Sequence, residues 1–218
     1  AGTLFSRVCE SPDGSFATER DRRETRRGGY RAQIFESRQT TWSSTLSKKG
    51  LAIVLAENIY KNLELHYPRL RLIEAGYDVK VVGPKKGETY GSKEGYPAVT
   101  DAAFEDIDPK RVKVLVVPGG FAPDKLRRYP GCNKLVADAW ANGAVVGSIC
   151  HAGWVPISAK IVRGVRLTSV SAIKDDLENA GATWVDEPCV VDGKFVSAQV
   201  PKDLPAFMEA ILRVAGQQ

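Results

Sequence analysis

The sequence lacks the features that mark a membrane span, a metal site or a disulfide framework. It contains no run of about eighteen apolar residues, so no membrane-spanning helix is predicted. It has only two histidines, and its four cysteines form neither a CxxC pair nor a metal-ligand spacing. Scattered free thiols are typical of a reducing compartment, which favours a cytoplasmic protein. The cysteines are Cys9, Cys132, Cys150 and Cys189.

The charge balance also excludes a strongly basic surface on the folded part. The chain carries 31 basic and 26 acidic side chains, for a net charge of +5. Residues 1–48 contribute +3 of this excess, and the remainder is nearly neutral. A nucleic-acid-binding face requires clustered basic side chains, and no such cluster follows Lys48. We therefore predict no nucleic-acid partner.

The first 47 residues differ in composition from the rest. They hold eight arginines interleaved with six acids, few aliphatic residues and no persistent period, so they predict an extension without its own core. It is either a solvated tail or an arm that docks on a partner. The acids argue against an import leader, although the chain begins with Ala1 and a mitochondrial location stays an alternative. Candidate anchors of such an arm are Phe5, Tyr30, Ile34, Phe35 and Trp42.

From residue 48 to 218 the sequence alternates short apolar runs with helical patterns. Strands are expected at 50–56, 77–83, 112–120, 144–150 and 165–169. Helices are expected at 62–76, 133–143, 171–181 and 203–216, with another opening at 151. In the first helix the spacing places four residues on one side: Leu63, Tyr67, Leu70 and Ile73. Asp192-Gly193 predicts a hairpin with a type I′ turn.

This alternation predicts an α/β fold with a mostly parallel sheet and helices on both faces. In such sheets the ligand site lies beyond the C-terminal ends of the strands. Two strand ends carry distinctive residues: Pro118-Gly119-Gly120 and Cys150-His151.

Cys150 lies where a buried strand meets the next helix. A sharp strand-to-helix turn exposes its side chain, as in a nucleophile elbow, and backbone N–H groups that point at the sulfur favour the thiolate. Small residues on both sides permit a close approach. The alternative is an inert core cysteine.

The motifs LVVPGGFAPD, GSICHAG, AGATWVD and VVDG follow one another in the order typical of one family. Across about residues 49–215 the chain resembles the PfpI family, which belongs to the superfamily of the Parkinsonism-associated deglycase. The resemblance implies a flavodoxin-like three-layer sandwich and an oligomer. It also implies a cysteine-dependent, peptidase-like or glyoxalase-type enzyme that acts on reactive aldehydes or their protein adducts, without metal or organic cofactor.

The resemblance also implies roles for particular residues. Cys150 matches the nucleophile and His151 the histidine beside it. Glu64 matches a carboxylate that hydrogen-bonds the cysteine and, when protonated, lowers its pKa. Glu57 is the less favoured alternative for that carboxylate. Asp124 matches an acid that reaches a neighbouring subunit's histidine, although the sequence alone favours an N-cap of a helix starting at Lys125.

The same resemblance implies an oxyanion pocket formed by backbone amides near Gly119, Gly120 and His151. Three departures from the family pattern affect the expected pocket: Glu94, Trp154 and Gln199.

Two alternatives to an enzyme remain at the level of sequence. The chain can be a structural subunit that the extension docks on a large intracellular assembly, or a redox sensor whose exposed cysteine is oxidised.

Overall fold

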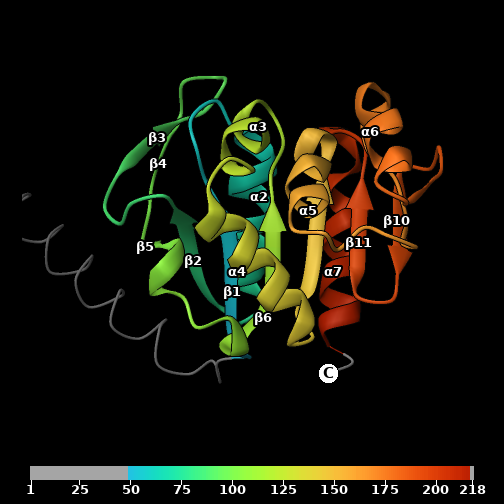
Figure 1. The fold of residues 1–218 in the computed structure, drawn as a ribbon. Coiled ribbons are helices and arrows are strands. Elements are labelled where there is room, and N and C mark those ends of the chain that lie inside the picture. Colours follow the sequence, from blue (N-terminus) through green and yellow to red (C-terminus); the bar gives the residue numbers. More distant parts are fainter. Residues whose placement is uncertain (1–48, 217–218) are drawn as a thin grey trace, which may run out of the picture. The chain divides into compact units, whose positions relative to one another are not determined.

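The computed structural model describes residues 49–216 (Figure 1). The predicted extension, its aromatic anchors and Cys9 lie outside the described residues. No helix within this part of the chain is both long enough and apolar enough to cross a membrane.

A seven-stranded sheet forms the centre, in the order β10-β11-β7-β6-β1-β2-β5. Every neighbouring pair is parallel except β10 and β11, which form an antiparallel hairpin at one edge. The strands are β1 (Leu51–Leu55), β2 (Asp78–Gly83), β5 (Ala102–Ala103), β6 (Val112–Val117), β7 (Val145–Ile149), β10 (Cys189–Asp192) and β11 (Phe195–Ala198).

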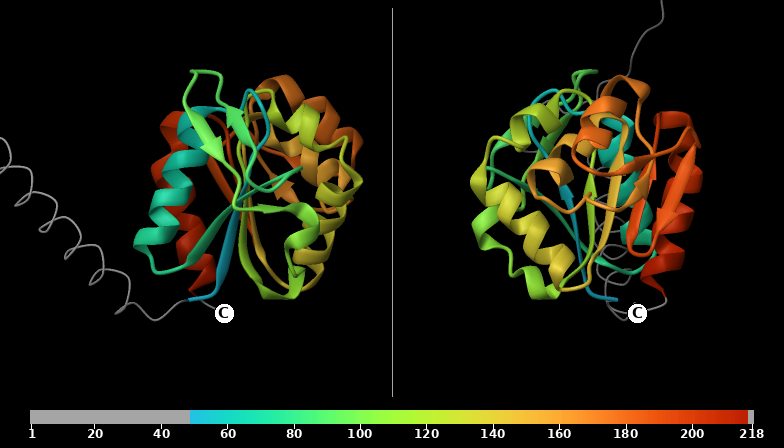
Figure 2. Two further views of the ribbon diagram at one scale, coloured as in Figure 1. Left: turned by 90° about the vertical axis from the view of Figure 1, so that its left-hand side faces the viewer. Right: turned by 45° about the vertical axis from the view of Figure 1, so that its right-hand side comes forward.

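Helices cover both faces of this sheet. Helices α2 (Asn62–Glu74) and α7 (Leu204–Ala215) pack together on one face (Figure 2). The opposite face is covered by α3 (Ala122–Leu126), α4 (Pro130–Ala141), α5 (Trp154–Ser158) and α6 (Lys174–Asn179). This is the flavodoxin-like three-layer α/β sandwich that the sequence predicts.

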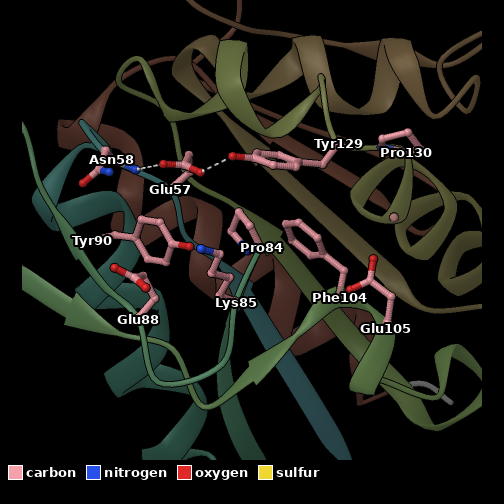
Figure 3. A pocket seen from close by; sticks show the side chains of 11 residues that line it. Glu57, Asn58, Pro84, Lys85, Glu88, Tyr90, Phe104, Glu105, Tyr129 and Pro130 are labelled. Carbon is pink, nitrogen blue, oxygen red and sulfur yellow. Dashed lines mark hydrogen bonds between the residues drawn. The ribbon is translucent and has the colours of Figure 1, made fainter.

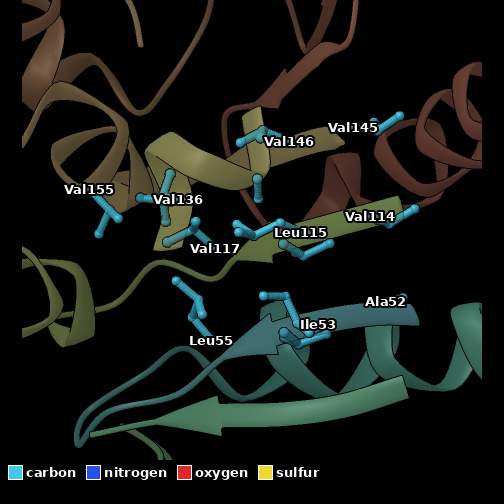
Figure 4. Close-up of a cluster of buried hydrophobic side chains, with 14 of the residues drawn as sticks. Ala52, Ile53, Leu55, Val114, Leu115, Val117, Val136, Val145, Val146 and Val155 are labelled. Atoms are coloured by element: carbon cyan, nitrogen blue, oxygen red, sulfur yellow. The ribbon is translucent and has the colours of Figure 1, made fainter. Parts of the chain in front are cut away.

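The core lies on the three central strands. Branched side chains of β1, β6 and β7 point to both faces of the sheet, where they meet helix residues such as Val136 and Val155 (Figure 4). Ile53, Leu115 and Val146 are fully buried. Burial of each such side chain stabilises the fold by about 1.5–3 kcal/mol. Because helices cover both faces of the sheet, these strands are unbroken apolar runs in the sequence.

Helix α2 begins at the expected residue and ends two residues earlier than expected, and it turns a different face to the core. Three of the four residues that the spacing places together do not form its buried side: Leu63, Leu70 and Ile73 are 54, 59 and 42% exposed, and only Tyr67 packs against the core. The buried residues are Glu64, Leu65, Pro68 and Leu72. The helix therefore directs a carboxylate, Glu64, into the interior.

The hairpin at β10 and β11 forms as predicted, but its turn type is wrong. Asp192 pairs with Phe195, so the two turn residues are Gly193 and Lys194. Only Gly193 has a positive φ, +56°, whereas a type I′ turn requires a positive φ at both positions.

The sequence also missed several short elements around the sheet. These are the hairpin of β3 (Thr89–Gly91) and β4 (Pro97–Val99), the strand β9 (Thr183–Trp184), and the 3₁₀ turns η1 (Phe104–Asp106), η2 (Pro109–Arg111) and η5 (Pro201–Asp203). The expected strand at 165–169 is present as the short β8 (Arg166–Leu167), and the helices expected to open at 151 and 171 begin with the 3₁₀ turns η3 (Cys150–Gly153) and η4 (Ser171–Ile173).

Candidate active site

Cys150 lies at the C-terminal end of β7, as the sequence predicts. Its φ of +63° is in the left-handed region, which residues other than glycine and asparagine rarely adopt. Such a conformation costs on the order of 1–3 kcal/mol and clusters at functional sites. The chain turns there from β7 into η3, which gives Cys150 the backbone shape of a nucleophile elbow.

The Pro118-Gly119-Gly120 turn after β6 lies directly beside this cysteine. A Cβ at Gly119 would come within 2.7 Å of both the Cys150 Cβ and the Glu64 Oε2. A Cβ at Gly120, where φ is +77°, would lie 2.5 Å from the backbone oxygen of Ile59. The absence of a side chain at Gly119 lets the thiol and the carboxylate approach each other, and its absence at Gly120 lets the turn pack against the backbone of residues 59–61.

Glu64 reaches this turn from the first turn of α2. It is fully buried, and its Oε2 accepts a hydrogen bond from the Gly119 N–H at 2.8 Å. Its Oε1 is buried without a hydrogen-bond partner among the described residues. Burial raises the pKa of Glu64 to about 7, so this carboxyl group can lose or gain a proton near neutral pH.

The thiol itself is not the stabilised thiolate that the sequence predicts. The pKa of Cys150 is raised to about 11, first by burial and then by the neighbouring charge of Glu64. Backbone N–H groups of His151 and Gly120 oppose this shift without cancelling it. The expected lowering of the Cys150 pKa is therefore wrong for the subunit, since desolvation outweighs the amides.

Only part of the predicted oxyanion pocket is available. The amides of Gly120 and His151 hydrogen-bond the sulfur of Cys150 and can stabilise an anion beside it. The Gly119 amide instead donates to Glu64. Gly119 therefore positions the carboxylate.

His151 adjoins the thiol through its side chain. Its Nδ1 lies 3.3 Å from the Cys150 Sγ. Burial and the charge of Lys93 lower the pKa of His151, which favours the neutral imidazole. The ring centroid of Trp154 lies 5.5 Å from that of His151, so the indole packs beside the imidazole.

Asp124 does not join this group within the subunit. It lies inside α3, where its carboxylate pairs with Arg128 one turn later. Its expected position as an N-cap is wrong, because the helix starts at Ala122 with Phe121 as its N-cap. Its proposed contact with a neighbouring subunit stays a prediction.

The alternative carboxylate, Glu57, points elsewhere. Its two oxygens accept hydrogen bonds from the Asn58 N–H at 2.7 Å and from the Tyr129 hydroxyl at 3.0 Å. Among the residues that the structure describes, Glu64 rather than Glu57 lies beside Cys150, and each of the two groups shifts the pKa of the other.

Sequence reasoning missed Lys61. Its backbone N–H donates to the Gly119 oxygen at 3.1 Å, and its positive charge favours the ionised forms of both Glu64 and Cys150. The Lys61 ammonium pairs with Glu94, whose other oxygen accepts from the Asn62 N–H at 3.0 Å. Lys61 could have been identified from the sequence because it lies three residues, or one helical turn, before Glu64.

Comparison with known proteins identifies the family of this arrangement. The profile of the DJ-1/PfpI family matches residues 50–214. A deglycase of Pyrococcus abyssi is 41% identical over 162 residues, which cover 74% of this chain and 97% of that protein. Protein/nucleic acid deglycase 2 of Escherichia coli K12 is 35% identical over 176 residues, covering 78% and 99%.

Solved structures agree with this result. A two-domain protein of Anabaena variabilis with DJ-1/ThiJ/PfpI-like and ferritin-like domains superposes with a TM-score of 0.75 at 34% identity; the match covers 77% of this chain and 48% of that one. Drosophila melanogaster DJ-1beta gives a TM-score of 0.71 at 24% identity, covering 77% and 91%. The relatives named deglycases support an enzymatic activity, and the chain belongs to the DJ-1/PfpI family.

Proposed function

We propose that this protein is a cysteine-dependent enzyme for reactive 2-oxoaldehydes such as methylglyoxal, or for their adducts on proteins. The observation that carries the proposal is the elbow conformation of Cys150 with a buried carboxyl group and an imidazole beside it. The relatives are named deglycases, which supports an action on glycation adducts.

In the first step the sulfur attacks the aldehyde carbon. Because the pKa of Cys150 is raised, the thiol must give up its proton as the C–S bond forms, and the ionised Glu64 or the neutral His151 accepts it. The carbonyl π electrons move to oxygen, next to the amides of Gly120 and His151. Protonation of that oxygen gives a hemithioacetal.

In the second step a proton moves from the former aldehyde carbon to the adjacent ketone carbon. The base that took the thiol proton is placed to mediate this transfer, which converts the hemithioacetal into a thioester of a 2-hydroxy acid. Water then attacks the thioester carbonyl, the C–S bond breaks, and the thiol is regenerated. The sum is addition of one water to methylglyoxal to give lactate, with no external oxidant or reductant.

We also propose that a second subunit completes the site. Asp124 lies on the short helix α3, which packs against the turn that carries His151. Its carboxylate is partly exposed, so it can reach the imidazole of a neighbouring copy and orient it.

The test is the variant Cys150→Ser in the full chain, assayed for production of lactate from methylglyoxal. We expect a loss of about a thousandfold or more in kcat/KM with an unchanged circular dichroism spectrum. The matched control is Cys189→Ser, a partly buried cysteine of β10, which retains activity. Full activity in Cys150→Ser would remove the proposal.

A further inference from the structure

A cavity lies beyond the C-terminal ends of β1 and β2, at the same end of the parallel strands as Cys150 (Figure 3). It has a volume of about 430 Å³ and extends from Glu57 to the start of α4 at Pro130. None of Cys150, His151 and Glu64 lines it. The cavity is therefore distinct from the proposed active site.

Glu57 is the buried acid of this cavity, with only 4% of its surface exposed. Two neutral donors, the Asn58 N–H and the Tyr129 hydroxyl, bond its oxygens. No ion pair joins it to a lysine, arginine or histidine between residues 49 and 216. A buried carboxylate without a positive partner is costly, and a cation in the cavity would offset that cost.

The rest of the lining adds negative charge. Glu88 and Glu105 also face the cavity, and neither forms an ion pair with a residue of the described part of the chain. Lys85 is the one basic side chain in the lining. Three carboxylates against one ammonium leave an excess of negative charge, which selects for a cationic ligand.

Aromatic rings form the remaining walls. Tyr90 and Phe104 are 5 and 3% exposed, and the ring centroids of Phe104 and Tyr129 are 5.9 Å apart. The pKa of Tyr90 is raised to about 12, first by burial and then by the charge of Glu57, so its hydroxyl stays protonated. The faces of such rings attract cations and accept the flat surface of a guanidinium group.

We propose that this cavity binds a guanidinium group, with Glu57 as the buried acceptor and the rings of Phe104 and Tyr129 as its walls. A guanidinium is planar, carries donors in a fork that matches carboxylates, and sheds water more readily than an ammonium. The described residues contain no group of three or more side chains suited to a metal ion, which favours an organic cation over a metal. This site goes beyond the proposed reaction at Cys150.

The guanidinium can come from a free metabolite or from an arginine in a polypeptide. Agmatine represents the first source and N-acetylarginine amide the second. N-acetylcitrulline amide is the neutral control of nearly equal shape. Titrations of the ¹⁵N-labelled full chain followed by NMR report binding at the Asn58 amide, which bonds Glu57, and at the Gly131 amide, which lines the cavity.

We expect saturable shifts at these two amides with agmatine or with the arginine amide, and none with the citrulline amide. If agmatine has the lower Kd, the source is a free metabolite; if N-acetylarginine amide has the lower Kd, the source is an arginine in a polypeptide. Glu57→Gln weakens binding about tenfold or more, the effect of losing one charge-assisted hydrogen bond. Independently, Glu105→Gln weakens binding because it removes one of the three negative charges of the lining. The control Glu209→Gln, an exposed acid of α7 on the opposite face, leaves the affinity unchanged.

Because Glu105 is exposed, its variant keeps the test valid if Glu57→Gln fails to fold. Equal binding of the citrulline amide, no saturable shift with either cation, or an unchanged affinity in Glu105→Gln would overturn the proposal. Loss of methylglyoxal turnover in Cys150→Ser concerns the other site, so the two proposals fail separately.

Discussion

Glu57 and Glu64 are two buried carboxylates only seven residues apart, and the structure treats them differently. Both oxygens of Glu57 accept a hydrogen bond, one from a backbone N–H and one from a tyrosine hydroxyl. In Glu64 one oxygen accepts from the Gly119 N–H, and the other has no hydrogen-bond partner among the described residues. The same residue type is thus fully bonded in one place and incompletely bonded in the other.

This difference separates a carboxylate suited to binding from one suited to proton transfer. A carboxylate whose oxygens are both bonded is held in one orientation and shapes the space around it. A carboxyl group that is desolvated and incompletely bonded holds its proton to a higher pH, and it can exchange that proton with a neighbour. Only Glu64 has a thiol beside it.

The largest effect is expected from Glu64→Gln. The amide preserves the shape and can still accept from the Gly119 N–H, but it cannot take the thiol proton. We expect kcat/KM for methylglyoxal to fall by about a hundredfold to ten-thousandfold. The control is Glu74→Gln, an exposed acid at the end of the same helix. A Glu64→Gln enzyme within about threefold of the wild type would contradict the assignment.

The pH dependence of the wild type sharpens the same point. Below pH 7 Glu64 is mostly protonated and cannot accept the thiol proton, because its pKa is raised to about 7. We therefore expect kcat/KM to rise with pH through about 7, in stopped assays between pH 5.5 and 8.5. Because the pKa of His151 is lowered, a rise caused by the imidazole would be centred at a lower pH. A profile that is flat between about pH 6 and 8 would show that Glu64 is not the base.

The free energy of unfolding should depend on pH because the ionised Glu64 is costly to bury. The pKa of Glu64 is raised in the folded chain to about 7, against 4.5 for the ordinary group, so the folded state binds the proton more tightly. Its contribution to the free energy of unfolding is present at low pH and is lost as the pH rises through 7. Glu64→Gln removes that loss, so we expect a gain of about 3 kcal/mol at pH 8 and almost none at pH 4.5.

Urea unfolding of both proteins at the two pH values measures this difference. An equal change at pH 4.5 and pH 8 would show that the buried charge is not its source.

The smallest effect is expected at the other carboxylate. Tyr129→Phe removes the hydroxyl that bonds Glu57 and leaves that oxygen without its donor. Because the Tyr129 side chain is 38% exposed, water replaces part of the bond, and we expect a loss of about 1 kcal/mol in the free energy of unfolding. Tyr96→Phe, at a more exposed tyrosine, is the control, and an equal loss there would contradict this reading.

The layered fold could be predicted from the sequence because strands that are buried on both faces are continuous apolar runs. The strands around Ile53, Leu115 and Val146 are continuous apolar runs since helices cover them on each side. The position of Cys150 could be predicted because the apolar run of β7 ends at Ile149, directly before it. Glu64 was found by resemblance, since its own segment does not distinguish it from a solvated helix acid.

What the sequence could not supply depends on contacts between distant segments. The buried face of α2 is chosen by the sheet and α7, so Leu63, Leu70 and Ile73 are exposed despite their spacing. The ionisation of Cys150 depends on burial by the turn after β6 and on the charge of Glu64, neither of which is local. The amides near the sulfur were predicted, but the desolvation that outweighs them was not.

The loop between Glu57 and Lys61 joins the two sites. The oxygen of Ile59, at its middle, accepts from the Phe121 N–H at 2.8 Å, so the loop is bonded to the turn that holds the Gly120 amide beside the sulfur. A cavity ligand that moved Glu57 would act on this loop and, through that hydrogen bond, on the turn beside the sulfur. Thermodynamic linkage makes the influence reciprocal: whatever factor a cavity ligand imposes on substrate affinity, bound substrate imposes on the cavity ligand.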